Sequence, residues 1–219
     1  MEVSGVSQRS VYIMGAGGFG REVADVVRAA HAADPGGGWE LAGFYDDRAS
    51  QVNIDRLNAL GVPFLGPLPD APPHEGAGLI VGVGNPQVRQ RIIARCTDAG
   101  WEFPTVVHPS ASWGANVEIG EGNVLCAGVR ITTNVTLGRH VHLNLNATVG
   151  HDAVLEDFVS VNPGAAISGE VHVKEATLIG VGAIVLEGRT VGARSIVGAA
   201  ACAVKDVPDD VIVKGIPAK

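Results

Sequence analysis

An aliphatic residue recurs at every sixth position through the C-terminal half of the chain, and this period limits the fold more than any other feature. Fifteen of the seventeen positions are Val, Ile or Leu, and no insertion breaks the count. An α-helix repeats at 3.6 residues and an ordinary strand at 2, so neither produces a period of six. The positions are Val107, Trp113, Ile119, Leu125, Ile131, Leu137, Leu143, Val149, Leu155, Val161, Ile167, Val173, Ile179, Val185, Val191, Val197 and Ala203.

The position four residues after most of these holds Ala or Val, as at Ala111, Val129 and Ala147. This restriction suggests an interior corner that successive turns share. Hexapeptide repeats of this kind are typical of a parallel β-helix. Three hexads make one triangular coil, so residues eighteen apart lie directly above one another, about 4.7–4.9 Å from coil to coil. Stacked coils bury the aliphatic column that one repeat cannot bury alone.

Composition and charge exclude several classes of protein. The chain of 219 residues is 46% hydrophobic and 18% charged, which is typical of a globular protein. A formal net charge of −7 argues against nucleic acid as a partner. Cys96, Cys126 and Cys202 lie far apart, so we expect no disulfide framework. No apolar run approaches eighteen residues and the first ten residues lack a signal-peptide core, so we expect a soluble, cytoplasmic protein without a membrane span.

Strand and helix patterns alternate before the repeat begins. Residues 49–78 contain five prolines and are predicted to be rich in loops. The alternation predicts a small parallel α/β domain at residues 1–106, followed by the β-helix domain at residues 107–219. The expected strands are 11–14, 41–45, 79–83 and 104–107, and the expected helices are 21–33 and 86–99.

A glycine-rich turn lies between the first strand and the first helix. The motif Gly15-x-Gly17-x-x-Gly20 has the context that phosphate-binding loops require. Glycines let the backbone approach a phosphate, and N–H groups at a helix N-terminus favour an anion. A full dinucleotide fold needs more strands than about a hundred residues supply, so one nucleotide diphosphate at Gly15, Gly17 and Gly18 is favoured over NAD. A purely structural turn is the alternative.

Two carboxylates follow the second predicted strand. Asp46 and Asp47 lie at its carboxyl end, where α/β sheets place groups that bind ligands. They are candidates for hydrogen bonds to a ribose or a base. A solvated strand end is the alternative interpretation.

Six short segments, taken together, resemble the sugar O-acyltransferases related to sialic-acid O-acetyltransferase and to the nucleotide-amino-sugar N-acetyltransferases of bacterial glycan synthesis. The resemblance implies a left-handed β-helix, a homotrimer with active sites between neighbouring prisms, acetyl-CoA as donor, and an N-terminal domain that holds the nucleotide of the acceptor sugar. The segments are Gly15–Val23, Phe44–Asp47, Val83–Asn85 with Arg89, Val107–Ala111, Val149–Asp152 and Gly215–Lys219.

Acetyl transfer needs a base for the acceptor amine or hydroxyl, and imidazole, with a pKa of about 6.5, is suited to that role. His151 is similar in position to the general base of the family, and Asp152 to the acid that orients it. The eighteen-residue spacing places Gly169 one coil above His151 and Thr133 one coil below. The Gly169 N–H is a candidate donor to the thioester oxygen.

The remaining site predictions concern the acceptor and the donor. Asn144 resembles a position that contacts the acceptor in the family, whereas Asn146 is interpreted as a stacked corner residue. Relatives often have a second histidine nine residues after the base, which helps to hold the donor, and this chain has Ser160 there. Coenzyme A is expected along the C-terminal coils, between two subunits. The residues predicted to line it are Gly169, Ser160, Gly180, Gly182, Gly198 and Ala199.

Three functions remain open at this point. The first is N-acetylation of a UDP- or GDP-linked amino-deoxy sugar, and the second is O-acetylation of a sugar or sialic-acid hydroxyl. The third is a non-catalytic or metal-dependent hexapeptide protein. Metal binding is disfavoured because His140 and His142 fall on a different face from His151 in the eighteen-residue map. The glycine loop and Asp46-Asp47 favour the nucleotide sugar.

Overall fold

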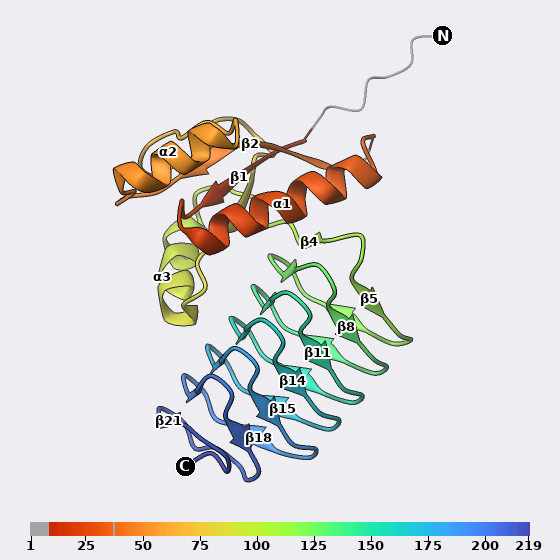
Figure 1. Ribbon diagram of the computed structural model, residues 1–219. Helices are drawn as coiled ribbons and strands as arrows, with labels where there is room; N and C mark the ends of the chain where they lie inside the picture. Colours follow the sequence, from red (N-terminus) through yellow and green to blue (C-terminus); the bar gives the residue numbers. More distant parts are fainter. Residues whose placement is uncertain (1–8, 37) are drawn as a thin grey trace. The chain divides into compact units, whose positions relative to one another are not determined.

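The computed structural model describes residues 9–36 and 38–219 (Figure 1). Two compact units are present. The first holds the described residues up to Val83 together with Ile92–Pro104, and the second holds Gly84–Arg91 and Thr105–Lys219. The second unit thus consists of a short segment, Gly84–Arg91, and a long continuous segment that begins at Thr105.

The described part of the first unit contains a three-stranded parallel sheet with the strand order β2-β1-β3. Helix α1 follows β1, and the spacing of Val23 and Val27 puts both on its buried face. The predicted parallel α/β arrangement is confirmed, and three strands are too few for the two halves of a dinucleotide fold. The elements before Thr105 are β1 (Arg9–Met14), α1 (Gly18–Ala33), β2 (Trp39–Tyr45), α2 (Gln51–Ala59), β3 (Gly78–Val81) and α3 (Pro86–Cys96), and α3 has residues in both units.

Helix α2 lies within residues 49–78, where the sequence pattern indicated no helix, and residues 60–77 are loops as expected. The Ser50 side chain caps the helix and accepts a hydrogen bond from the Asn53 N–H at 3.3 Å. Among the residues of α2, Leu57 alone is buried, so the helix lacks the apolar stripe by which a helix is recognised in a sequence. No helix in the described ranges is both long and apolar enough to cross a membrane.

The second unit is a left-handed parallel β-helix, whose coils are stacked in Figure 1. In residues 105–219, three sheets of two-residue strands form its sides. We call the sheet from β4 to β21 the first sheet, that from β5 to β20 the second, and that from β6 to β18 the third. The strands are β4 (Val106–Val107), β5 (Ser112–Trp113), β6 (Glu118–Ile119), β7 (Val124–Leu125), β8 (Arg130–Ile131), β9 (Thr136–Leu137), β10 (His142–Leu143), β11 (Thr148–Val149), β12 (Val154–Leu155), β13 (Ser160–Val161), β14 (Ala166–Ile167), β15 (His172–Val173), β16 (Leu178–Ile179), β17 (Ile184–Val185), β18 (Thr190–Val191), β19 (Ile196–Val197), β20 (Cys202–Ala203) and β21 (Ile212–Val213).

Three corners join the sheets in each coil. In the coil that begins at β10, the first corner is residues 144–147, between the first and second sheets. The second corner is residues 150–153, between the second and third sheets, and the third corner is residues 156–159. Equivalent residues of other coils belong to the same corners.

The strand register confirms the eighteen-residue spacing. Thr148 pairs with Ala166, and Val154 pairs with His172. The inward aliphatic column forms one continuous buried core from Leu125 to Ala203. At the start of the column Trp113 is half exposed, because β5 is an edge strand.

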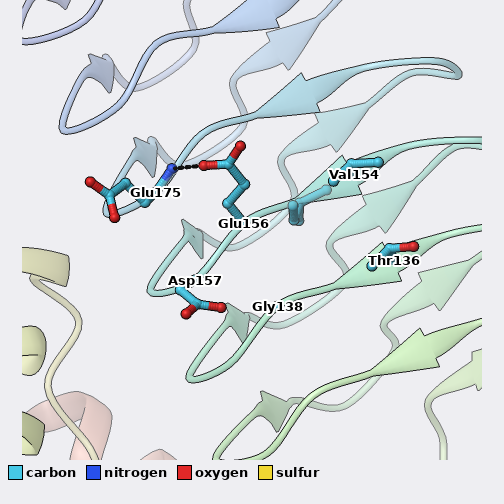
Figure 2. Close-up of a pocket in the computed structure, with 7 residues that line it drawn as sticks. Thr136, Gly138, Val154, Glu156, Asp157 and Glu175 are labelled. Atoms are coloured by element: carbon cyan, nitrogen blue, oxygen red, sulfur yellow. Dashed lines mark hydrogen bonds between the residues drawn. The ribbon is translucent and has the colours of Figure 1, made fainter.

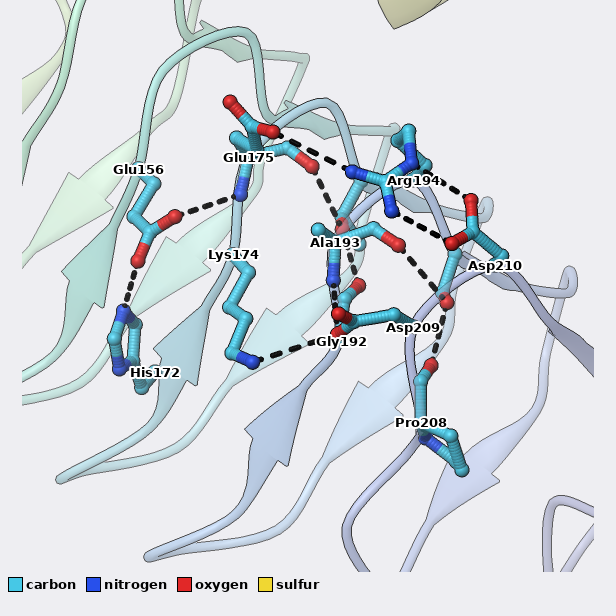
Figure 3. A network of polar contacts seen from close by, with 12 residues as sticks. Glu156, His172, Lys174, Glu175, Gly192, Ala193, Arg194, Pro208, Asp209 and Asp210 are labelled. Atoms are coloured by element: carbon cyan, nitrogen blue, oxygen red, sulfur yellow. Dashed lines mark hydrogen bonds and ion pairs between the residues drawn. The ribbon is translucent and has the colours of Figure 1, made fainter.

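Ion pairs join successive coils at the third corner (Figure 3). Glu156 accepts hydrogen bonds from the His172 ring at 2.6 Å and from the Glu175 N–H at 2.9 Å. Arg194 pairs with Asp210 at 2.6 Å and with Glu175 at 3.4 Å. Exposed pairs of this kind stabilise by at most about 1 kcal/mol each, so the aliphatic column remains the main source of stability.

Candidate active site

His151 and Asp152 form a hydrogen-bonded pair on the second corner. The His151 Nδ1 atom lies 2.7 Å from Asp152 Oδ2, and the two side chains are 50% and 46% exposed. Because a carboxylate only accepts hydrogen bonds, Nδ1 carries the proton and Nε2 keeps its lone pair. The hydrogen bond to Asp152 raises the pKa of His151, and the charges of Glu187 and Glu170 raise it further. The pair has the arrangement of a general base and its orienting acid.

Gly169 lies against the His151 ring. A Cβ atom added at Gly169 would lie 2.5 Å from both Cε1 and Nε2 of the imidazole, so a side chain at this position would displace the ring. The Gly169 N–H has no hydrogen-bond acceptor among the residues described. On the other side of the ring's coil, Thr133 donates its hydroxyl hydrogen bond to the Ala115 carbonyl at 2.9 Å. The Asp152 N–H donates to the Thr133 carbonyl at 3.1 Å and the Glu170 N–H to the His151 carbonyl at 2.7 Å, so the coils of Thr133, His151 and Gly169 are stacked in this order.

The residues predicted for the acceptor and for coenzyme A lie mainly on another corner. Asn144 is on the first corner, is 6% exposed and accepts a long contact from the Cys126 thiol at 3.9 Å. The second sheet separates this corner from His151 within one chain, and no hydrogen bond joins Asn144 to His151 among the described residues. The other predicted site residues on the first corner are Gly180, Gly182, Gly198 and Ala199.

Coil packing explains why some of these first-corner positions hold small residues. A Cβ atom at Gly180 would lie 2.6 Å from the Ala199 nitrogen, so the close approach of successive coils requires glycine there. Gly182 has a left-handed φ of +63°, and the space beside it is open. Gly182 therefore leaves a shallow wall without being needed for packing.

Ser160 is engaged within the fold. It is 2% exposed on the outer face of the first sheet. Its hydroxyl donates to the Gly84 carbonyl at 2.9 Å and accepts from Arg89 at 3.0 Å. The structure does not bring Ser160 to the corner that carries His151.

Arg89 is a buried residue whose structural role the sequence analysis missed. Its guanidinium is fully buried and donates to the carbonyl oxygens of His140 at 3.0 Å and Phe158 at 2.7 Å. Burial lowers its pKa to about 9. Asn85 caps the same helix by accepting from the Val88 N–H at 2.9 Å. Gly84–Arg91 is thereby fastened to the β-helix, and the spacing Asn85-x-x-x-Arg89 was its sequence signal.

The glycine loop contains two kinds of glycine. Gly15 has a left-handed φ of +112°, and a Cβ atom at Gly20 would overlap the Gly15 carbonyl oxygen, so the fold itself requires both. Nothing lies within 4 Å of a Cβ atom built at Gly17 or Gly18. The N–H groups of these two residues have no acceptor within the part of the chain that the structure describes. Gly17 and Gly18 thus present open backbone at the N-terminus of α1, where an anion is favoured.

Asp46 and Asp47 both brace loops. Asp46 Oδ2 accepts from the Ala16 N–H at 2.8 Å and ties the glycine loop to the end of β2. Asp47 accepts from the Leu68 N–H at 3.0 Å and pairs with Arg95 at 2.8 Å, which lowers the pKa of the Asp47 carboxyl. Each Asp46 oxygen retains a lone pair for a ligand hydroxyl, whereas Asp47 is held by a charged partner.

An open cavity of about 340 Å³ lies on the third sheet and third corner (Figure 2). None of the site residues predicted from the sequence lines it. Its carboxylates are already paired, Glu156 with His172 and Asp157 with Arg139. The lining residues are Thr136, Gly138, Val154, Leu155, Glu156, Asp157 and Glu175.

Within the described residues, no group of three or more His, Cys, Asp or Glu side chains is placed to hold a metal ion. His140 and His142 are buried, and burial lowers the pKa of His140 to about 4 and that of His142 well below its ordinary value. Both lie away from the second corner, on the third corner and the first sheet.

Known proteins share this arrangement over nearly the whole chain. The family model for the PglD N-terminal domain matches residues 10–96. The acetyltransferase domain of PglB from Neisseria gonorrhoeae FA1090 is 33% identical with a TM-score of 0.81, and the match covers 97% of this chain and 99% of that one. PerB from Caulobacter crescentus, solved in complex with CoA and GDP-perosamine, is 30% identical with a TM-score of 0.77, and the match covers 96% of each chain. The GDP-perosamine N-acetyltransferase of Escherichia coli O157:H7 is 29% identical over 177 residues, 80% of this chain and 77% of that protein.

A left-handed β-helix built from hexads places the molecule in the class of hexapeptide-repeat acyltransferases. More narrowly, the chain belongs to the hexapeptide-repeat sugar acetyltransferase family and is an enzyme. The resemblance inferred from the sequence segments is confirmed.

Proposed function

We propose that this enzyme transfers an acetyl group from acetyl-CoA to the amino group of a UDP- or GDP-linked amino-deoxy sugar in the cytoplasm. The observation that carries the proposal is the exposed His151 ring, held from behind by Asp152 and placed against Gly169. Relatives with CoA and GDP-perosamine bound support the substrate class, and a relative with acetyl coenzyme A bound supports the donor. The cysteines form no disulfide, which fits a reducing compartment.

The chemistry follows from the two nitrogens of the His151 imidazole. His151 Nε2 accepts a proton from the acceptor amine as the nitrogen attacks the thioester carbonyl carbon. The C–N bond forms, the C–S bond breaks, and the CoA thiolate leaves with a proton from the imidazolium. Asp152 stabilises the imidazolium that exists between these proton transfers. The Gly169 N–H donates to the oxygen that becomes negative in the tetrahedral intermediate.

A homotrimer with intersubunit sites explains why the predicted residues occupy two corners. His151 and Gly169 lie on the second corner, whereas Asn144, Gly180 and Gly198 lie on the first. The second sheet lies between these corners within one prism, so the two sets face one cleft only when the second corner of one subunit meets the first corner of another. Such a cleft would hold coenzyme A along the shallow first-corner wall and its thioester beside His151.

The first unit supplies the nucleotide site in this proposal. The open backbone at Gly17 and Gly18 suits a diphosphate, and the remaining lone pairs of Asp46 suit a ribose hydroxyl. Gly15 and Asp47 then shape this site by holding the turn and the neighbouring loop.

The test combines one variant with a substrate panel. His151→Ala is expected to lower kcat by more than about 10²-fold, the scale of general-base loss, while acetyl-CoA binding measured by calorimetry is unchanged. Purified enzyme is assayed with GDP- and UDP-linked amino sugars and with matched sugars that carry a hydroxyl in place of the amine. Near-full turnover by His151→Ala would remove the base from the mechanism, and transfer to hydroxyl sugars alone would refute N-acetylation.

A further inference from the structure

A column of asparagine side chains leads to Asp152 on the second corner. Asn116, Asn134 and Asp152 are eighteen residues apart and have left-handed φ angles of 56°, 56° and 59°. The Asn116 amide donates to Asn134 Oδ1 at 3.1 Å, and the Asn134 amide donates to Asp152 Oδ1 at 3.0 Å. Asp152 Oδ2 then accepts from His151 Nδ1 at 2.7 Å. One hydrogen-bonded chain therefore crosses three coils and ends on the imidazole.

The direction of this chain is imposed by its acidic end. An ionised carboxylate has no proton to donate, so Asn134 must turn its NH₂ group toward Asp152. Its carbonyl oxygen then faces the preceding coil and must accept, as it does from Asn116. Each rung thus donates toward the active site, and the Asp152 carboxylate has one oxygen held by Asn134 and the other by His151.

We propose that Asn134 is a positioning residue of the active site, whose amide holds the Asp152 carboxylate in the plane that presents Oδ2 to His151. This role rests on the proposed function, in which His151 is the base. Because Asn134 in the coil below holds Asp152 Oδ1, the carboxylate cannot rotate and Oδ2 stays next to His151 Nδ1. The hydrogen bond to Oδ2 then keeps the imidazole ring against Gly169. Without the amide, the half-exposed Asp152 side chain rotates toward water and the ring loses its orienting partner.

Corner conformation alone accounts for other asparagines but not for this contact. Asn146 has a similar left-handed φ of 58° on the first corner, where its amide packs against Gly128 and has no hydrogen bond to a charged side chain among the described residues. Asparagine is common in this conformation, and Asn116 and Asn146 need no further explanation. What separates Asn134 is that its hydrogen bond ends on a catalytic carboxylate, and this bond is the largest cause of the lowered pKa of Asp152.

The charged groups around the dyad set the expected pH effect. Glu170 and Glu187 face His151 from the next two coils, and both raise its pKa together with Asp152. The contribution of Asp152, which includes the hydrogen bond, is the largest and depends on Oδ2 remaining at Nδ1. Loss of the Asn134 amide therefore lowers the pKa of His151, while the two glutamates keep their effect.

Two glycine variants separate the amide from the backbone conformation. Glycine adopts a positive φ without strain, so Asn134→Gly and Asn116→Gly each keep the corner and remove one amide. Asn134→Gly is expected to lower kcat about tenfold, the scale for loss of a residue that orients a catalytic group, and to move the acid limb of kcat/KM to lower pH. The KM for acetyl-CoA stays the same. Asn116→Gly, one coil further away, is expected to keep kcat and the KM for acetyl-CoA within twofold of the native values and to leave the acid limb of kcat/KM in place.

Parallel measurements make each outcome decisive. If Asn134→Gly and Asn116→Gly give the same kcat and pH profile, Asn134 is only a corner residue and the inference is wrong. If His151→Ala retains activity, the proposed function has failed instead, whatever the asparagines do. If Asn134→Gly does not fold, Asn134→Asp keeps the corner conformation but replaces the donor with an acceptor. It must then lose at least as much kcat, and native turnover by Asn134→Asp overturns the inference.

Discussion

Replacing Gly169 with alanine tests the geometry of the proposed catalytic corner directly. The new Cβ atom would lie 2.5 Å from Cε1 and Nε2 of His151 and 3.0 Å from Cδ2. Nonbonded carbon contacts are most favourable at about 3.5–4.0 Å, so the imidazole has to move by roughly 1 Å. A misplacement of about 1 Å costs about 10²-fold in rate, or about 2.7 kcal/mol in the activation barrier. We therefore expect kcat of Gly169→Ala to fall about 10²-fold although its N–H is retained.

The assay is a double-mutant cycle. For each variant, kcat is measured from the release of the CoA thiol at saturating amino sugar and acetyl-CoA. In the His151→Ala background there is no ring to displace, so adding Gly169→Ala is expected to cost less than about twofold. Thermal unfolding provides the structural control. The His151 ring is half exposed and can turn into water, so stability should change by no more than about 0.5 kcal/mol.

Two results would refute this reasoning. Native kcat for Gly169→Ala would mean that the working position of the His151 ring is not beside Gly169. Equal losses in the native and His151→Ala backgrounds would mean that the alanine acts through the coil and not through the imidazole.

Four further substitutions test other parts of the structure. Asp152→Asn removes the carboxylate that raises the pKa of His151. The proposed base works only when neutral, so the acid limb of the kcat/KM profile should move to lower pH as kcat falls. Arg89→Ala leaves buried carbonyl oxygens without their donor and should lower the free energy of unfolding by about 3 kcal/mol, measured with urea. Gly20→Ala should prevent folding of the first unit, seen by circular dichroism, because its Cβ overlaps the turn. Gly17→Ala should fold normally and raise the KM of the nucleotide sugar.

The sequence predicts the β-helix well because the period is repeated in every coil and each repeat reports the same geometry. Once eighteen residues make a coil, the neighbours of any residue follow by counting, which is how Gly169 could be placed beside His151. The missed helix α2 shows the opposite case. With Leu57 as its buried residue, α2 depends on the Ser50 cap and has no pattern that repeats.

Contacts between distant segments escaped prediction for a physical reason. Asp47 pairs with Arg95, forty-eight residues away, and Arg89 reaches the carbonyl of His140, fifty-one residues away. Neither separation is a multiple of the eighteen-residue coil repeat, so neither contact could be predicted from the spacing of residues in the sequence. The same holds for Ser160, whose hydroxyl donates to the Gly84 carbonyl and accepts from Arg89, seventy-six and seventy-one residues away.

The proposed catalytic corner depends on three successive coils that make different contributions at equivalent positions. The coil below supplies a side-chain donor, Asn134, which fixes the carboxylate of Asp152. The coil above supplies Gly169, whose missing side chain leaves room for the ring of His151. Exchanging the two would fail on both counts, because a side chain above would displace the imidazole and a glycine below would release the acid. A regular solenoid therefore builds an asymmetric site by changing one residue in each coil while the aliphatic column that stacks the coils stays the same.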